Sequence, residues 1–255
     1  MTSKENNDDT INFFEDNNYF EYPKDNIKFF MQEELPMVDE NGEMLLNEEG
    51  IVKEAADGHG GVFNAIFKND ILTDMREKGI EWFFIVPVDN PLLRMVDEEA
   101  IGITIKNNVL VLGKSLVKKS PEEKVGVFCK KNGRTSVVEY INITEEMANQ
   151  RDEKGELVYG EAHILCNMFN IKAIEKIEKK NLPYMAAHKK TKFMNDNGEI
   201  IEPSSPNAYK FECFIFDAFE EINSMIILRV KREEEFAPVK NVNRRRQPSK
   251  CNSII

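Results

Sequence analysis

The sequence predicts an α/β fold with a mixed, mostly parallel sheet and flanking helices. Strand-like segments alternate with segments of helical spacing, a pattern typical of α/β proteins. Residues 83–88 form a continuous apolar run, as in a strand covered on both faces. Between an expected strand at 27–31 and a helical pattern at 62–75 lies the loop Ala-Asp-Gly-His-Gly-Gly at 56–61. Such a loop can expose backbone N–H groups to a ligand, although a tight turn before a helix is the simpler alternative.

The first half of the chain is expected to begin with a short helix over 10–17, with Thr10 as its N-cap. Asn41 and Gly42 predict a turn before a short hairpin. The apolar positions of the later helical pattern recur near helical spacing, which indicates one buried face. In chain order the expected elements are the strand 27–31, the hairpin 44–52, the helix 62–75, the strand 83–88, the helix 97–106 and the strand 109–112.

The second half contains a clear hairpin signal at Asn132-Gly133, between expected strands at 125–130 and 135–140. The further expected elements are a strand at 164–169, a surface helix at 171–180, a turn at 195–198, an apolar helix at 209–218 and a strand at 225–230. Since we find no internal repeat and no low-complexity linker, we expect one domain over 1–241 and a disordered tail over 242–255.

The acidic composition argues against a nucleic-acid partner. Lys and Arg number 34 against 45 Asp and Glu, a formal charge of −11, which repels phosphate backbones. The basic run at 244–246 is short and sits in a polar tail. The four cysteines lack metal-ligand spacing, which fits a reducing compartment. With no signal-peptide pattern and no apolar run of bilayer length, we expect a cytoplasmic protein without a membrane partner.

A series of motifs in fixed order resembles the UDP-sugar pyrophosphorylase family, nearest to its UDP-N-acetylglucosamine pyrophosphorylase branch. The resemblance covers roughly residues 1–241. Its motifs include Met-Thr-Ser at 1–3, Phe-Phe-Met-Gln at 29–32, the glycine loop at 56–61, Val-Asp-Asn at 88–90, Val-Val-Glu-Tyr at 137–140 and Glu-Phe-Ala-Pro-Val-Lys-Asn at 235–241. The resemblance implies a Rossmann-like, GT-A-like nucleotide-diphospho-sugar transferase fold. It also implies that UTP and a sugar 1-phosphate give pyrophosphate and a UDP-sugar, either UDP-N-acetylglucosamine or UDP-glucose.

The resemblance assigns Gln32 and Gly58 to the uracil. An amide side chain offers both a donor and an acceptor to the base edge, and the glycine backbone would pack on the base. An exposed glutamine at a strand end is the alternative for Gln32. His59 stands where relatives usually carry Asn, so an imidazole would keep one hydrogen bond but not the paired geometry of an amide.

Two carboxylates are expected near the phosphates and the sugar. Asp89 follows an expected strand, and Mg²⁺ prefers carboxylate oxygens while it bridges substrate phosphates. The family equivalent lies at the ribose and the metal; the alternative is a turn or cap residue. The resemblance assigns Gly126 and Glu139 to the sugar, whose hydroxyls could satisfy a buried carboxylate. A salt bridge to a lysine is the alternative for Glu139.

His163 marks a departure from the family pattern. Relatives read Phe-Asn-x-Gly-Asn where this chain reads Tyr-Gly-Glu-Ala-His at 159–163. His163 therefore replaces an asparagine that touches the sugar, which leaves the identity of the sugar open; a core histidine is the competing interpretation. Lys210 and Lys240 match two family lysines that contact phosphates and are the expected catalytic residues, since lysine suits charge developing on phosphate oxygens.

The family's first segment, a strand followed by a Gly-Gly-x-Gly-Thr-Arg-Leu-Gly loop around the triphosphate, has no counterpart in this sequence. We therefore expect an N-terminally truncated fold with weak or no catalysis by itself. A separate N-terminal segment that carries the loop would be its natural partner. The alternatives are a non-catalytic fragment and a UDP-sugar-binding protein derived from the family.

Overall fold

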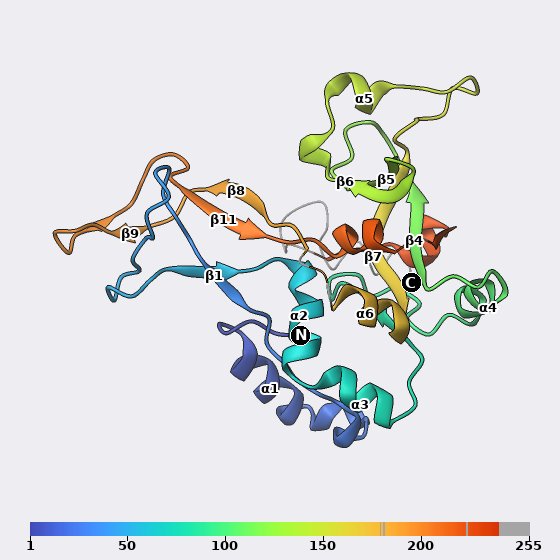
Figure 1. Cartoon of the computed structure of the whole chain (residues 1–255), viewed down its shortest axis with the longest axis horizontal. Coiled ribbons are helices and arrows are strands. Elements are labelled where there is room, and N and C mark those ends of the chain that lie inside the picture. The colour runs from blue at the N-terminus through green and yellow to red at the C-terminus, as the bar shows by residue number, and fades with distance from the viewer. Residues whose placement is uncertain (179, 181, 223, 240–255) are drawn as a thin grey trace. The chain divides into compact units, whose positions relative to one another are not determined.

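A computed structural model describes residues 1–178, 180, 182–222 and 224–239, which form two compact units (Figure 1). Unit 1 comprises Met1–Glu77 and Ile177–Ala218, and unit 2 comprises Lys78–Lys176 and the chain from Phe219 onward. The division runs through the segment 1–241 that we expected to form one domain. The expected tail at 242–255 lies outside the described residues.

Unit 1 begins with α1 (Asn7–Asp16), which starts three residues before the expected helix. Thr10 is therefore not the N-cap: its hydroxyl donates to the Asn6 carbonyl at 2.6 Å from inside the first turn. Two short 3-10 helices follow, η1 (Asn18–Glu21) and η2 (Lys24–Asn26). The ring of Phe14 packs at 5.4 Å from Phe20 and 5.1 Å from Phe29, which fixes this segment against α1.

The expected strand at 27–31 is wrong. Residue 31 forms one isolated parallel bridge with Thr2, through bonds of 2.8 Å from the Thr2 amide to the Phe30 carbonyl and from the Gln32 amide to the Thr2 carbonyl. A strand needs a partner over several consecutive residues, and the described chain offers only this bridge. The first regular strands are β1 (Glu34–Pro36) and β2 (Glu54–Ala56), which pair antiparallel.

The predicted turn at Asn41-Gly42 is confirmed, with Gly42 at a φ of +88°. The hairpin over 44–52 is reduced to isolated bridges that include Val38–Met44 and Leu46–Val52. Downstream, the glycine loop leads into η3 (His59–Gly61). The expected helix at 62–75 is two helices, α2 (Val62–Lys68) and α3 (Ile71–Glu77). They are separated where Asp70 adopts a φ of +54°, a left-handed conformation that ends helical hydrogen bonding.

The rest of unit 1 consists of short antiparallel strand pairs: β8 (Met185–Lys189) with β11 (Ala208–Glu212), and β9 (Phe193–Met194) with β10 (Ile200–Ile201). The turn at 195–198 is confirmed, with Gly198 at a φ of +80°. The expected apolar helix at 209–218 is wrong, because every residue of β11 pairs with β8 and the remainder enters the 3-10 helix η5 (Ile215–Glu221). Tertiary pairing here outweighs the local pattern.

Unit 2 is built on a six-stranded mixed sheet in the order β12-β4-β7-β5-β6, with β3 also paired to β7. Its strands are β3 (Trp82–Ile85), β4 (Val111–Val117), β5 (Val127–Lys131), β6 (Arg134–Val138), β7 (Glu161–Asn170) and β12 (Met225–Arg229). A mixed sheet is confirmed, but a mostly parallel one is wrong: β12–β4 is parallel, whereas β3–β7, β4–β7, β5–β6 and β5–β7 are antiparallel. The predicted hairpin is confirmed, with Asn132 and Gly133 both at positive φ, as a tight two-residue connection requires.

The sheet of unit 2 buries two apolar clusters. One contains Leu116, Ala162, Ile164 and Cys166, and the other contains Ala100, Leu112 and Met168. The helices near the sheet are α4 (Glu98–Lys106), η4 (Tyr140–Asn142), α5 (Glu145–Asn149), α6 (Ile171–Ile177) and α7 (Arg232–Glu235). The predicted helix at 97–106 is confirmed, with Asp97 as its cap.

The apolar run at 83–88 is a shorter strand than expected. β3 ends at Ile85 and its residues are half-buried, while Val88 is fully exposed. Asp89 therefore lies in a turn four residues beyond the end of the strand. No helix in the described part of the chain is both long and apolar enough to cross a bilayer.

Candidate functional site

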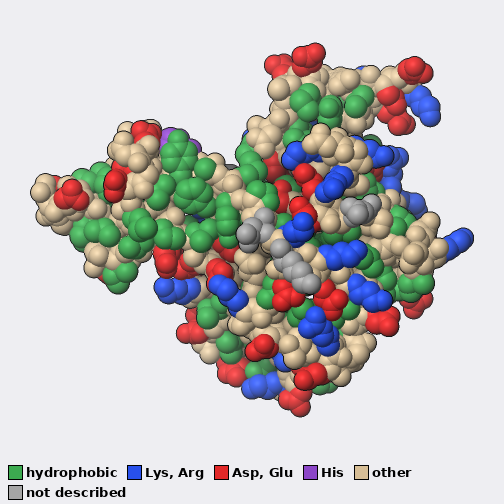
Figure 2. All heavy atoms as spheres, viewed as in Figure 1, with side chains coloured by type: hydrophobic (Ala, Val, Ile, Leu, Met, Phe, Trp, Pro, Cys, Tyr) green, Lys and Arg blue, Asp and Glu red, His purple; other side chains and the backbone are tan. Residues whose placement is uncertain are grey.

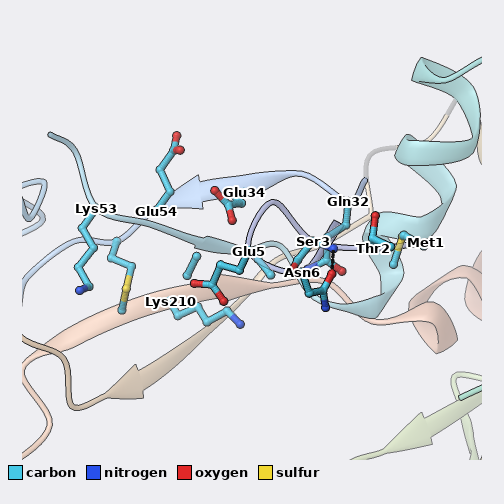
Figure 3. A pocket seen from close by; sticks show the side chains of 13 residues that line it. Met1, Thr2, Ser3, Glu5, Asn6, Gln32, Glu34, Lys53, Glu54 and Lys210 are labelled. Carbon is cyan, nitrogen blue, oxygen red and sulfur yellow. Dashed lines mark hydrogen bonds between the residues drawn. The ribbon is translucent and has the colours of Figure 1, made fainter. Parts of the chain in front are cut away.

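A cavity of about 530 Å³ within unit 1 brings together two predicted site residues, Gln32 and Lys210 (Figure 3). Gln32 is held by the Thr2 bridge, and Lys210 lies in the middle of β11. The other lining residues are Met1, Thr2, Ser3, Glu5, Asn6, Glu34, Met37, Lys53, Glu54, Ala55 and Ala56. The bridge and strand β11 thus place an amide and an ammonium on one polar cavity.

Charges of both signs line this cavity. Lys210 forms a 2.9 Å ion pair with Glu212, so a phosphate would have to replace that carboxylate as its partner. Lys4 lies 3.9 Å from Glu34 and 4.0 Å from Glu54. Burial lowers the pKa of the Met1 ammonium, which favours its neutral form. Over the face shown in Figure 2, Lys and Arg side chains lie among Asp and Glu side chains.

The glycine loop packs on the chain that follows β11. Gly58 has a φ of +88°, and a Cβ there would lie 2.4 Å from the Cys213 carbonyl oxygen. The Gly60 amide donates to that oxygen at 3.0 Å, and the Cys213 amide donates to the Asp57 carbonyl at 2.8 Å. Close backbone packing therefore accounts for glycine at position 58, and its contact with uracil stays a prediction.

His59 is engaged within unit 1. Its Nδ1 atom accepts a hydrogen bond from the Ile215 amide at 3.1 Å, and its ring packs 5.3 Å from Phe214 and 5.9 Å from Phe216. Burial lowers the pKa of this imidazole to about 4, so the ring is neutral near pH 7. With Nδ1 occupied as an acceptor, Nε2 carries the proton and is the atom left to contact a ligand.

Asp57 is a residue of this loop that the sequence did not single out. Its side chain is fully buried, and neither carboxylate oxygen has a hydrogen-bond partner among the described residues. Burial and the nearby charge of Glu33 raise its pKa to about 6. A Cβ at Gly61 would lie 2.2 Å from the carboxylate, so glycine is required there to house this side chain.

Three predicted sugar residues come together within unit 2. A Cβ at Gly126 would lie 3.0 Å from Oε1 of Glu139, and the His163 amide donates to the Gly126 carbonyl at 2.9 Å. Burial raises the pKa of Glu139. No charged neighbour among the described residues shifts the pKa of Glu139, so the alternative of a salt bridge to a lysine finds no support there.

The side chain of His163 is buried and engaged. Its Nε2 atom lies 3.1 Å from Oδ1 of Asn167, and its ring makes edge contacts with Phe128 at 5.0 Å and Phe219 at 5.9 Å. This environment fits the core-histidine interpretation better than an open sugar contact. The Nδ2 atom of Asn167 is buried without a partner among the described residues.

Asp89 lies in a tight polar turn of unit 2. Its carbonyl accepts a 2.6 Å bond from the Val239 amide. The neighbouring Asn90 is buried and bonds to the Glu235 carbonyl at 2.8 Å and to the Ala237 amide at 2.9 Å, so its role is structural. The described residues contain no cluster of three or more metal-ligating side chains. A single carboxylate can bind Mg²⁺ only when nucleotide phosphates and waters supply the other ligands. Lys240 lies outside the described residues.

Comparisons with known proteins match nearly the whole chain. The family model described as UTP–glucose-1-phosphate uridylyltransferase matches residues 1–244. UDP-N-acetylhexosamine pyrophosphorylase-like protein 1 of Mus musculus is 34% identical over 260 residues, which cover 100% of this chain and 51% of that protein. UDP-N-acetylglucosamine pyrophosphorylase of Saccharomyces cerevisiae is 32% identical over 248 residues, covering 94% and 52%.

A solved structure is similarly close. The crystal structure of the UDP-N-acetylglucosamine pyrophosphorylase from Trypanosoma brucei, in complex with an inhibitor, is 30% identical and superposes with a TM-score of 0.84. The superposition covers 98% of this chain and 51% of the Trypanosoma brucei chain. The chain spans about half the length of the curated relatives it matches.

Proposed function

The chain belongs to the UTP–glucose-1-phosphate uridylyltransferase family, and from this premise we propose that it is the uridine- and sugar-binding part of an enzyme that makes a UDP-sugar. An oxygen of the sugar 1-phosphate would attack the α-phosphorus of UTP, and the bond to the leaving pyrophosphate would break. The observation that carries the proposal is the shared cavity of Gln32 and Lys210 in a chain that matches this family over residues 1–244.

The uridine side of the proposal rests on Gln32. Its side chain lines the cavity, where an amide can donate to and accept from the uracil edge. Lys210 lines the same cavity. It would stabilise negative charge on the phosphates once a phosphate oxygen replaces Glu212 as the partner of its ammonium. Lys240 would supply a second charge of this kind.

The sugar side rests on Glu139 and Gly126. A half-buried carboxylate without a charged neighbour among the described residues gains from hydroxyl donors, and the glycine beside it leaves room for that carboxylate, which a Cβ would meet at 3.0 Å. The names of the relatives favour an N-acetylated sugar, hence UDP-N-acetylglucosamine as the product and UDP-glucose as the second candidate. His163 would narrow the pocket rather than touch the sugar directly.

Mg²⁺ is the proposed cofactor, and Asp89 is the residue that would hold it. The ion would neutralise phosphate charge during the transfer. Asp89 would share the ion with nucleotide oxygens and water, since the described residues contain no group of three or more metal-ligating side chains. The cysteine pattern, which fits a reducing compartment, supports a cytoplasmic location.

A pyrophosphate-release assay tests the proposal. The chain alone, with UTP, N-acetylglucosamine 1-phosphate and Mg²⁺, should stay near background, because losing even one preorganised donor costs roughly 10²–10³ in rate. Adding the N-terminal segment of a relative that carries the glycine-rich loop should raise the rate.

Two other outcomes of this assay would count against the proposal. Fast turnover by the chain alone would show that other residues handle the triphosphate. If the added segment gives no turnover but the chain still binds UDP-N-acetylglucosamine, the alternative of a non-catalytic UDP-sugar-binding protein is favoured.

A further inference from the structure

Lys114 is a fully buried lysine in the middle of β4. Its Nζ atom lies 2.5 Å from Oδ2 of Asp97 and 2.6 Å from Oε2 of Glu235. It also donates to the Arg94 carbonyl at 3.3 Å. One ammonium thus joins four segments of unit 2: strand β4, the loop at Arg94, the start of α4 and the end of α7.

Such a buried charge is tolerated only because its partners are complete. Burial by itself disfavours the ammonium, but the hydrogen bonds that Lys114 donates to Asp97 and Glu235 hold its pKa above the usual value. Asp97 in turn caps α4 by accepting from the Glu99 and Ala100 amides at 3.1 Å. The network therefore fixes the position of both carboxylates.

Glu235 carries the connection to Asp89. Its main-chain carbonyl accepts from the side chain of Asn90, whose Oδ1 atom accepts from the Ala237 amide. The Val239 amide then donates to the carbonyl of Asp89 itself. Segment 235–239 is thus tied to residues 89–90 by successive hydrogen bonds, and Lys114 holds the first residue of that segment.

The loop at 88–96 packs on the Leu116 cluster through Leu93, while two of its other apolar side chains are exposed. Val88 is 104% exposed and Val96 is 83% exposed, so these apolar side chains contribute little burial. Lys114 also reaches the far end of the loop through the Arg94 carbonyl and Asp97. The polar network thus holds both ends of the loop that carries Asp89.

We propose that Lys114 is a positioning residue for Asp89, acting through Glu235 and Asn90 without touching the ligand itself. The inference rests on the proposed function only in that Asp89 is taken as the Mg²⁺ and nucleotide carboxylate.

Hydrogen exchange tests the positioning without any ligand. In Glu235→Gln and Lys114→Met, the amides of Ala237 and Val239 should exchange about tenfold faster or more, because each variant removes a buried hydrogen bond between charged groups. The control is Arg229→Met, which breaks the ion pair with Glu161 elsewhere on the sheet and should leave these two amides unchanged. Lys114→Met leaves two buried carboxylates without their cation. If this variant fails to fold, the exchange rates of Glu235→Gln alone test the proposal. Unchanged exchange in Glu235→Gln would overturn the proposal.

A double-mutant cycle separates positioning from a general loss of structure. Calorimetry gives the factor by which Mg²⁺ tightens UDP binding. Glu235→Gln should reduce this factor in the unmodified chain but cause no further reduction in an Asp89→Asn background. Equal reductions in both backgrounds would overturn the proposal. If Mg²⁺ has no effect even on the unmodified chain, the role of Asp89 in the proposed function fails, and the exchange rates still decide whether Lys114 holds the loop.

Discussion

The Nδ1 atom of His59 accepts a hydrogen bond from the backbone amide of Ile215 at 3.1 Å. This bond joins the glycine loop to the start of η5 and requires a neutral imidazole. Burial meets this requirement by lowering the pKa of His59 to about 4. His59, which stands where the family usually has asparagine, is therefore packed and hydrogen-bonded within unit 1.

The first prediction concerns acid stability. In the unfolded chain His59 takes up a proton near its ordinary pKa of 6.5, whereas the folded chain resists protonation down to about 4. Its stabilising contribution is therefore present above pH 6.5 and is lost as the pH falls toward 4. Between pH 7.5 and 5, the unmodified chain should lose on the order of 1–2 kcal/mol more unfolding free energy than His59→Gln, measured by urea denaturation. Parallel pH profiles for the two proteins would contradict this.

Asp57 should change the pH dependence of stability in the direction opposite to His59. Its folded pKa of about 6 exceeds the ordinary value of 3.8, so the folded state binds the proton more tightly and loses stability as the pH rises from about 4 to 6. Asp57→Asn removes the unpartnered charge at little change in volume. The variant should exceed the unmodified chain in unfolding free energy by on the order of 1–3 kcal/mol at pH 7.5, with a smaller gain at pH 4. A gain that does not depend on pH would show that ionisation of Asp57 is not the cause.

Gly58 and Gly42 form a matched pair for testing the loop packing. Both have a φ of +88°, but a Cβ at Gly58 would meet the Cys213 carbonyl at 2.4 Å, whereas a Cβ at Gly42 meets nothing within 4 Å. Gly42→Ala should cost about 1 kcal/mol of backbone strain. Gly58→Ala should cost at least about 2 kcal/mol more, because backbone must move. Equal costs in urea denaturation would mean that the loop does not depend on this contact.

Glu139 should affect affinity for the sugar and not for the nucleotide. Glu139→Gln should weaken binding of UDP-N-acetylglucosamine about tenfold and leave UDP binding unchanged, since hydrogen bonds to charged groups contribute roughly 1.5–3 kcal/mol. Gly126→Ala should do the same by moving the carboxylate. Calorimetric titration with both ligands measures the difference. Equal losses for UDP and the UDP-sugar would remove Glu139 from the sugar site.

Local signals predicted some parts of the structure well. The helix at 97–106 and the Asn132-Gly133 hairpin depend on neighbouring residues, and each was found where the sequence placed it. The late strand was also found within its predicted range, as β12. Gly126 and Glu139 lie next to each other in the structure, and their contact with a sugar stays a prediction.

Features set by distant partners were missed. The segment at 209–218 has the apolar residues of a helix, but its first four residues belong to β11, which β8 pairs along its whole length, and its last four enter η5. The segment at 27–31 reads as a strand but pairs only through Thr2. Lys114 and Asp57 gave no sequence signal, because each looks like a surface residue until the structure shows that Lys114 pairs with Glu235 and that Asp57 packs against Gly61.

Calorimetric titration of the chain with UDP, ADP and GDP at one salt concentration, each with Mg²⁺, tests the central claim most directly. The account predicts that UDP binds more tightly than either purine nucleotide, and that Gln32→Ala removes this preference without unfolding the chain, because Gln32 would read the uracil edge. Equal affinity for the three nucleotides in the unmodified chain would contradict the assignment of a uridine site to this protein.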